Sequence, residues 1–363
     1  MYLEAIIDYM VANGKSQGEI ATALQTNGRL DVGSMRPFVD IETGKTCITV
    51  HIGGDPKNPE NYKDIAVNTS GVLRPSEWKQ LDEAVQGAAT LRKVGIADLE
   101  SRGLMYNLGN GMGTTVLENH TLSDAFEAEL TMDGVSKSKG DRPVYAANYL
   151  PIPIIHVDYE INARVLAASR TLGNPLDTTS AELAAEKVAE TLESMLFTNR
   201  SYAAFGGTIY SYVNFPQRNL ATITPWDGSG VTGADIIDMV RDMKQRSINA
   251  RHRGPWVLYI PTDYETILDK DYDATTPGTT IRERILKIDG IVDVKVVDYL
   301  AEDNVLLVQM TKNVVRLVKG MPITAVQWSS EGNFVNKYKV MTIQVPQIRA
   351  DFNGKTGIVH GSV

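Results

Sequence analysis

The sequence predicts a protein of mixed helices and strands that is divided into at least two lobes. The chain has 363 residues, whereas a single hydrophobic core stops growing near about 250–300 residues. Residues 179–200 have the pattern of one long amphipathic helix. Helical and strand patterns alternate over residues 232–330. We therefore expect one lobe built on the long helix and a second lobe of α/β character.

Composition excludes several classes of protein. Hydrophobic residues make up 43% of the chain and charged residues 22%, which is typical of a globular protein. The single cysteine, Cys47, allows no internal disulfide and is expected to be a buried, inert thiol. No uncharged apolar run approaches the length of a membrane span, and MYLEAIIDYM lacks the basic start of a secretory signal. The net charge of −8 argues against a protein that reads nucleic-acid sequence. We expect a soluble intracellular protein.

The first 72 residues are predicted to be an extension. Residues 1–30 carry two short helical patterns, and residues 45–52 alternate like a strand. A helix-turn-helix interpretation is disfavoured because no basic recognition face follows, so we expect an amphipathic arm that packs on a neighbour. A helix is then expected from Leu73 to about Asp98, with Ser76 as its cap.

Residues 114–162 are predicted to be long strands around a polar tip. The tip, DGVSKSKGDRP, has no side chains that could form a core. Pro151 and Pro153 cannot lie in a central ladder, so the second strand is an edge or an exposed arm. Because a two-stranded arm is only marginally stable by itself, we expect another subunit to support it.

The helix at 179–200 is the strongest helical pattern in the chain. Thr179 and Glu182 have the spacing of a capping box. Its apolar stripe consists of Ala184, Val188, Leu192, Met195 and Leu196. The glutamates predicted to lie largely off this stripe are Glu182, Glu186, Glu190 and Glu193.

The rest of the chain continues with short elements. Helices are predicted at residues 234–250, 263–268 and 280–287. Strands are predicted at residues 256–260, 292–297, 305–310 and 314–318. Two further strands, residues 339–345 and 348–352, are expected to return outside the second lobe.

No catalytic, cofactor or metal constellation is found. The glycine cluster at 109–113 is not followed by a helix that could bind phosphate, so we expect a strand bend there. Asp269, Asp271 and Asp273 have the spacing of a calcium loop, but Ala274 and Thr280 replace its glycine and its glutamate. We therefore expect a solvated loop, no metal site and no enzyme.

Four stretches in the middle of the chain carry a family resemblance, and their order is its most specific feature. They are YLPIPIIHVDY at 149–159, ASRTLGNPLD at 168–177, the long helix at 179–200 and GGTIYSYVNF at 206–215. In this order they resemble the encapsulin and tailed-phage major capsid protein group, over roughly residues 73–363. The resemblance implies an α+β fold of the Hong Kong 97 capsid type.

The resemblance also implies a domain organisation. Residues 1–72 would be an N-terminal arm or small helical and strand extension, and 73–111 would lead into a peripheral domain. The E-loop, which lies over a neighbouring subunit, would be 112–155. The peripheral domain with its spine helix 179–200 would be 156–231 and 331–363, and the axial domain 232–330.

Site residues follow from the same resemblance. The E-loop tip that contacts another subunit would include Lys137, Lys139, Asp141 and Arg142. The loop at the capsomer axis would include Asp269, Lys270, Asp271, Tyr272 and Asp273, with Arg282 or Arg284 of a neighbour as partners for its acids. An isopeptide cross-link of Lys137 or Lys139 to Asn353 is a further candidate.

The function implied is structural. The chain would be a major capsid protein that assembles with itself into pentamers and hexamers and encloses double-stranded DNA without binding its sequence. Portal, scaffold or decoration proteins would be its other partners, and it would lie in the virion after assembly in the bacterial cytoplasm, away from membranes. The alternative is an encapsulin-like nanocompartment around an enzyme cargo. The helix at Ser76–Gln86 favours that alternative, and the 72-residue extension disfavours it.

Overall fold

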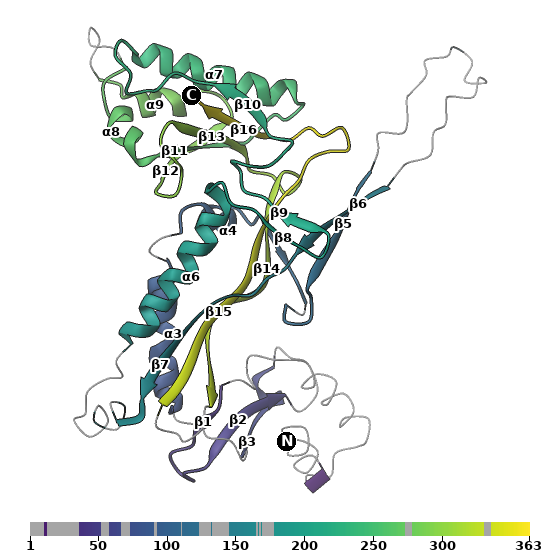
Figure 1. Ribbon diagram of the computed structural model, residues 1–363, viewed down its shortest axis with the longest axis vertical. Helices are drawn as coiled ribbons and strands as arrows, with labels where there is room; N and C mark the ends of the chain where they lie inside the picture. Colours follow the sequence, from purple (N-terminus) through teal and green to yellow (C-terminus); the bar gives the residue numbers. More distant parts are fainter. Residues whose placement is uncertain are drawn as a thin grey trace.

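The computed structural model describes most of the chain and has an elongated α+β architecture (Figure 1). A lobe of helices and strands lies at one end, and a body of long strands and helices forms the middle. A small sheet lies at the other end, and a two-stranded arm leaves the body at the side. The described residues are 11–12, 36–51, 58–66, 73–90, 93–109, 111–122, 132, 145–164, 166, 168, 178–272, 278–329 and 335–363.

The body contains a four-stranded sheet in the order β4-β14-β15-β7. These strands are Met105–Asn107, Val315–Ser329, Val335–Ile348 and Ile155–Asn162. β7 pairs only with β15 in this sheet, which confirms that the chain after Pro153 forms an edge strand. The helices α3 (Pro75–Thr90), α4 (Gly95–Ser101) and α6 (Thr179–Phe197) pack against the sheet and share one hydrophobic core with it.

α6 is the predicted long helix, three residues shorter at its end than expected. Its predicted stripe is largely buried, but the capping box at Thr179 is wrong. The N-cap is Thr178, whose backbone is helical and whose side chain caps no N–H group; its hydroxyl instead donates to Glu182 Oε1 over 2.6 Å. A capping box forms at the start of α7, between Thr232 and Asp235.

The single helix predicted from Leu73 to about Asp98 is two helices. Pro75 opens α3, as its fixed φ allows at a first helical position, so Ser76 lies inside the helix. The side chain of Glu77 accepts a hydrogen bond from the N–H of Arg74 over 2.8 Å. This contact, and not a serine cap, satisfies a backbone donor at the start of the helix.

The second lobe is a five-stranded sheet in the order β10-β16-β13-β11-β12. The strands are β10 Asn219–Thr222, β11 Trp256–Pro261, β12 Ile291–Val297, β13 Asn304–Gln309 and β16 Ile358–Ser362. Its helices are α7 Gly233–Asn249, η3 Thr262–Tyr264, α8 Glu265–Leu268 and α9 Ile281–Leu286. One face of the sheet packs on α7 and α9, while Val257, Tyr259 and Val308 on the other face belong to the core of the body.

The last part of the chain differs from expectation. Residues 349–352 are not a strand, and the strand that follows, β16, was not predicted. β16 does not lie with the body: it is inserted between β10 and β13, parallel to the first and antiparallel to the second. In contrast, β14 leaves the lobe at 232–330 and extends through the body beside β15.

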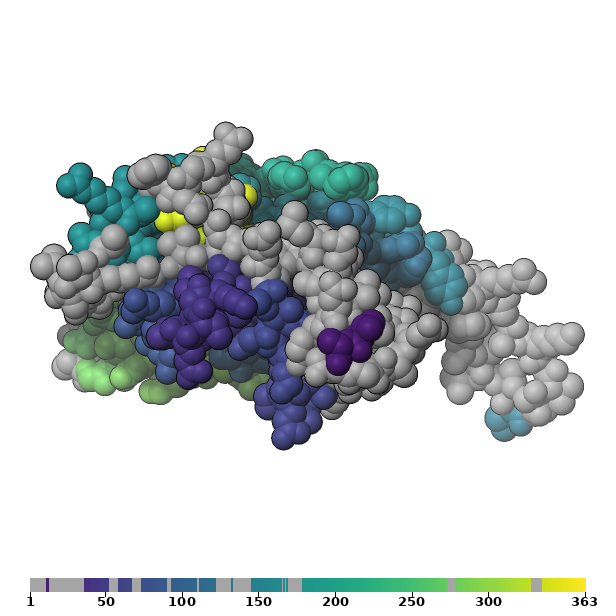
Figure 2. Space-filling model, turned by 90° about the horizontal axis from the view of Figure 1, so that it is seen from below, coloured from purple at the N-terminus to yellow at the C-terminus, as the bar shows by residue number. Residues whose placement is uncertain are grey.

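The small sheet is formed by β1 Phe38–Val39, β2 Thr46–His51 and β3 Tyr62–Ala66, with the turn η2 Pro59–Asn61 before β3. It lies on the lower face of the molecule, in purple in Figure 2. Arg36 attaches it to α3, because its guanidinium lies 2.7 Å from Asp82 and 4.4 Å above the Trp78 ring. Cys47 is buried in β2, as predicted. Apart from residues 11–12, the helices predicted within 1–30 lie outside the described residues.

Within the described residues, no helix combines the length and the apolar character that crossing a membrane requires.

Candidate assembly elements and the junction between the lobes

The arm consists of β5 (Val116–Leu122) and β6 (Tyr145–Pro151). They pair antiparallel with each other and, among the described strands, with no other, and they stand away from the body (Figure 1). Residues 145–149 are exposed, with Tyr145 at 66% and Tyr149 at 46%. The arm therefore offers both faces of its second strand to a partner.

The root of the arm is packed. Leu150 and Ile152 belong to a third hydrophobic cluster with Ile209 of a short hairpin. The remaining buried members, from β14 and β15, are Val318, Met321, Val326, Met341, Ile343 and Val345. The arm is thus anchored at its base, and residues 145–149 of its second strand are exposed beyond it.

A groove of about 490 Å³ lies beside this root. Its walls are β6, the hairpin β8–β9 (Tyr202–Ala204, Gly207–Ile209) and residues 347–354. The hairpin tip carries Phe205, which is 74% exposed at a φ of 49°. Asn353 lies in the exposed turn next to the groove, where Gly354 N donates to Asp351 O. The arm-tip candidates Lys137, Lys139, Asp141 and Arg142 lie outside the described residues, so the cross-link stays a prediction.

The predicted axis loop is described as far as Tyr272, and Asp273 lies outside the described residues. Asp269 pairs with Arg282 of the same chain over 3.4 Å, and the guanidinium of Arg284 lies 4.9 Å above the Tyr272 ring. Lys270 O accepts the N–H of Ile281. The expected pairing of these arginines with a neighbour's acids therefore competes with partners inside the chain.

No cluster of three or more potential metal ligands occurs among the described residues, the axis loop included as far as Tyr272.

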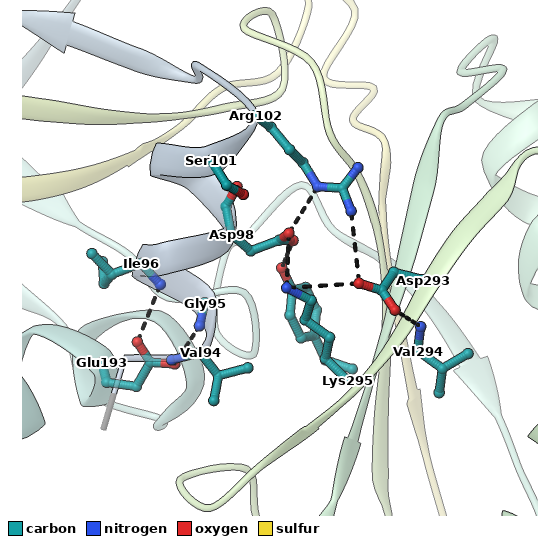
Figure 3. Close-up of polar contacts among 11 residues, drawn as sticks. Val94, Gly95, Ile96, Asp98, Ser101, Arg102, Glu193, Asp293, Val294 and Lys295 are labelled. Atoms are coloured by element: carbon teal, nitrogen blue, oxygen red, sulfur yellow. Dashed lines mark hydrogen bonds and ion pairs between the residues drawn. The ribbon is translucent and has the colours of Figure 1, made fainter. Parts of the chain in front are cut away.

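A buried carboxylate joins the two lobes. Asp98 of α4 is 2% exposed and lies between the body and the five-stranded sheet (Figure 3). It accepts from Arg102 Nε at 2.8 Å, from the Tyr259 hydroxyl of β11 at 2.8 Å, and from Lys295 Nζ of β12 at 3.0 Å. Burial alone would raise the pKa of Asp98, but these three hydrogen bonds together hold the pKa below its usual range. The carboxylate is therefore charged and fully partnered.

A second buried carboxylate fixes α4 to the long helix. Glu193 of α6 is 1% exposed and accepts the N–H groups of Val94, Gly95 and Ile96 at 3.1, 2.5 and 3.2 Å (Figure 3). These are unsatisfied donors of a helix N-terminus, where a negative charge is favourable. Burial raises the pKa of the Glu193 carboxyl, and the three N–H donors oppose that rise.

Glu193 is among the glutamates predicted to lie largely off the apolar stripe, and the structure buries it instead. A sequence signal for its burial exists, because Ala185, Ala189 and Glu193 are spaced by four and so share one line along the helix. Both alanines are fully buried. For Asp98 the sequence carries no such signal, since Tyr259 and Lys295 are more than 160 positions away along the chain.

A buried histidine gives the second lobe a pH dependence. His360 lies in β16. Its Nδ1 accepts a hydrogen bond from Arg218 Nε, and its Nε2 lies 2.7 Å from Asn304 Oδ1. Burial, with a smaller contribution from the Arg218 charge, lowers the pKa of His360 to about 4. The folded protein therefore disfavours the protonated ring.

We expect the free energy of unfolding to fall by about 3 kcal/mol as the pH falls from about 6.5 to about 4, because the unfolded chain binds this proton first. Urea unfolding across this range measures the effect. His360→Gln should flatten the dependence, and His156→Gln, at an exposed site on β7, is the substitution control. Equal slopes for His360→Gln and the unmodified protein would contradict the assignment.

Comparison with solved structures identifies the fold. The virus-like particle from Pyrococcus furiosus matches with a TM-score of 0.58 and 18% identity, covering 78% of this chain and 99% of that one. The capsid of Myoviridae phage XM1 matches with a TM-score of 0.58 and 10% identity, covering 75% and 92%. The capsid of a native GTA particle matches with a TM-score of 0.50 and 13% identity, covering 85% and 95%. The predicted α+β fold of the Hong Kong 97 type is confirmed.

Sequence comparison agrees with this fold. The type 1 encapsulin shell protein EncA of Myxococcus xanthus is 22% identical over 247 residues, which are 67% of this chain and 75% of that protein. The resemblance to encapsulins and phage capsid proteins is therefore confirmed. The profile of a family of unknown function, DUF6260, matches residues 78–361, which include the arm, both lobes and both buried carboxylates. The chain belongs to the DUF6260 family.

Proposed function

We propose that this chain is the subunit of a closed protein shell, specifically the major capsid protein of a tailed phage. The observation that carries the proposal is the arm. Its second strand, with Tyr145 and Tyr149, is exposed over residues 145–149 and stands away from the body. A two-stranded ribbon needs a further surface to be stable, and a second copy supplies it.

An arm at one side of a subunit favours head-to-tail contacts, because the surface that reaches out differs from the surface that receives it. Such contacts close into rings where the rotation between copies allows it. We infer pentamers and hexamers as the rings, with the five-stranded lobe toward the ring centre and the body at its periphery. The axis loop at Asp269–Tyr272 would then lie near the ring centre.

The contents would be double-stranded DNA held without sequence recognition. A chain with a net charge of −8 avoids the phosphate neutralisation that produces tight DNA binding. Likeness in fold to the phage XM1 and GTA capsids supports this form of the proposal. We assign the subunit no catalytic role, place it in the virion after assembly in the host cytoplasm, and leave portal, scaffold and decoration proteins as partners to be tested.

A nanocompartment is the second candidate. The match to the EncA shell protein favours it, as does the virus-like particle from P. furiosus, of which the chain covers 99%. The extension formed by residues 1–72 favours the capsid instead.

Imaging and content analysis of purified particles separate these candidates. Negative-stain electron microscopy should show closed shells. Nuclease-resistant DNA inside shells isolated from their native source supports the capsid, whereas a co-purifying enzyme inside DNA-free shells supports the nanocompartment. A protein that remains monomeric under all assembly conditions would contradict both.

The arm provides a sharper prediction. Tyr145→Ala together with Tyr149→Ala should abolish shell formation while the subunit stays folded, since buried tyrosines at interfaces contribute about 2 kcal/mol or more each. Size-exclusion chromatography and circular dichroism measure the two outcomes. The matched control, Tyr145→Phe with Tyr149→Phe, keeps both rings and should assemble. If the alanine variant formed normal shells, the two tyrosines of the arm would not be part of the interface.

A further inference from the structure

The loop that leads into the arm crosses β14 where two glycines touch. Leu108 N donates to Lys319 O over 2.9 Å, and the chain then turns before β5 begins. A Cβ atom on Gly111 would lie 2.6 Å from the Cα, carbonyl carbon and carbonyl oxygen of Gly320. A Cβ atom on Gly320 would lie 2.8 Å from the Cα of Gly111 and 3.0 Å from Cγ2 of Ile343. Because nonbonded carbons pack at about 3.5–4.0 Å, neither position has room for a side chain.

The sheet is irregular at this crossing. The pairing of β14 with β15 shifts register between Lys319 and Met321, which places Gly320 at the break. Such a break bends a strand, and a glycine within a strand permits another backbone to approach closely. The glycine cluster at 109–113 therefore has a packing role in the structure.

The other strand of the arm has a similar contact. A Cβ atom on Gly207, at the start of β9, would overlap the carbonyl oxygen of Tyr149 and lie 2.6 Å from its carbonyl carbon. It would also lie 3.0 Å from Cδ of Pro151. The hairpin backbone thus rests on β6 at the point where β6 emerges from the core. Each strand of the arm is fixed at its root by a contact that requires glycine.

We propose that Gly111, Gly320 and Gly207 are positioning residues that set the angle between the arm and the body. This inference rests on the proposed function, because the arm angle then determines how two copies are placed in the shell. Residues 145–149 are exposed, and Tyr149 lies against the buried Gly207, so the contacts at the root set their direction within a subunit.

The length of the arm amplifies small changes at the root. A Cβ atom at the glycine crossing forces the two backbones apart by about 1 Å. The seven residues of β5 extend about 23 Å from that point, so a rotation at the root moves the distal end by several ångströms. A closed shell repeats one contact geometry around its symmetry axes, so this displacement changes the assembled product.

The test compares Gly111→Ala, Gly320→Ala and Gly207→Ala with Gly109→Ala. Gly109 belongs to the same glycine cluster, has open space around its Cβ position and has no left-handed φ, so it is a matched control. Spin labels at Ala147→Cys on the arm and Ser180→Cys on α6, in a Cys47→Ser background, report the arm angle in unassembled subunits. Circular dichroism reports folding, and electron microscopy reports the yield and size of particles.

We expect the three variants to fold, to shift or broaden the label distance, and to lose about tenfold in yield of closed particles, equivalent to about 1.4 kcal/mol per contact. Gly109→Ala should match the unmodified protein in every readout. An unchanged label distance in folded Gly111→Ala and Gly207→Ala would overturn the inference. So would the unfolding of all three, because the contacts would then hold the core and not the arm.

The proposed function and this inference are tested by different measurements, so one can be wrong while the other holds. If the unmodified protein forms no shell, the shell proposal is wrong, while the label distances in single subunits still decide whether the glycines set the arm angle.

Discussion

Asp98→Ala is expected to lower the free energy of unfolding by about 3–5 kcal/mol, the usual cost of removing one partner from a buried ionic cluster. The substitution removes the acceptor of Arg102, Tyr259 and Lys295 at once, at distances of 2.8 to 3.0 Å. It therefore leaves two cations and a hydroxyl without their shared partner at the contact between the lobes. Urea unfolding of unassembled subunits, followed by circular dichroism, measures the loss.

Asp293→Ala is the matched control for this prediction. Asp293 contacts the same two cations, but at 3.7 Å from Lys295 and 4.0 Å from Arg102, and its side chain is 42% exposed. Exposed pairs contribute about 1 kcal/mol or less, so the control should cost little. Equal losses for the two variants would mean that the buried carboxylate has no special role at the junction.

The cluster also predicts a response to acid. Because the pKa of Asp98 is held below its usual range, its contribution to stability is present above about pH 4 and is lost as the pH falls further. Asp98→Asn should remove this part of the acid sensitivity.

Glu193→Ala is expected to cost about 3 kcal/mol, because an unsatisfied buried polar group costs about 1–3 kcal/mol and three N–H groups lose their acceptor. The loss should be concentrated in α4, which Glu193 fixes to α6. Hydrogen exchange of the amides of Gly95 and Ile96 should therefore accelerate more than that of the amides of α7, and urea unfolding gives the total.

Glu190→Ala on the same helix is the control. Glu190 pairs with Lys187 over 2.7 Å at the surface, and such pairs contribute about 0.2–0.5 kcal/mol. Glu193→Gln should fall between the two, since it keeps one acceptor oxygen. If Glu193→Ala cost no more than Glu190→Ala, the carboxylate would not be the element that fixes α4.

Local patterns in the sequence predict the helices and strands whose formation depends on neighbouring residues in the chain. The 3.6-residue stripe of α6, the buried strand WVLYI and the proline-limited edge at residues 151–153 are all found. Each depends on neighbours within one or two turns or within one strand. The resemblance to capsid and encapsulin proteins supplied the overall fold, which these patterns alone do not specify.

Features that depend on distant partners were missed. β16 is a short strand whose place between β10 and β13 is set by residues 50 or more positions away. Glu193 is a polar residue that is buried because it binds the start of α4. The contact between Gly111 and Gly320 cannot be predicted from the sequence, because the two glycines lie on segments that are far apart in the chain. The shift of the cap from Thr179 to Thr178 reflects how poorly helix ends are fixed by spacing alone.

The position of β16 has a consequence for how the chain acquires its structure during synthesis. About 136 residues separate the end of β10 from the start of β16, which ribosomes need about 7–27 s to translate. Throughout that interval β10 has no partner in this sheet, and from its own synthesis onward β13 has none on the side that faces β10, so the second lobe cannot be completed. Subunits with a finished second lobe therefore arise only after residues 358–362 have emerged, which delays the lobe-dependent steps of assembly until that point.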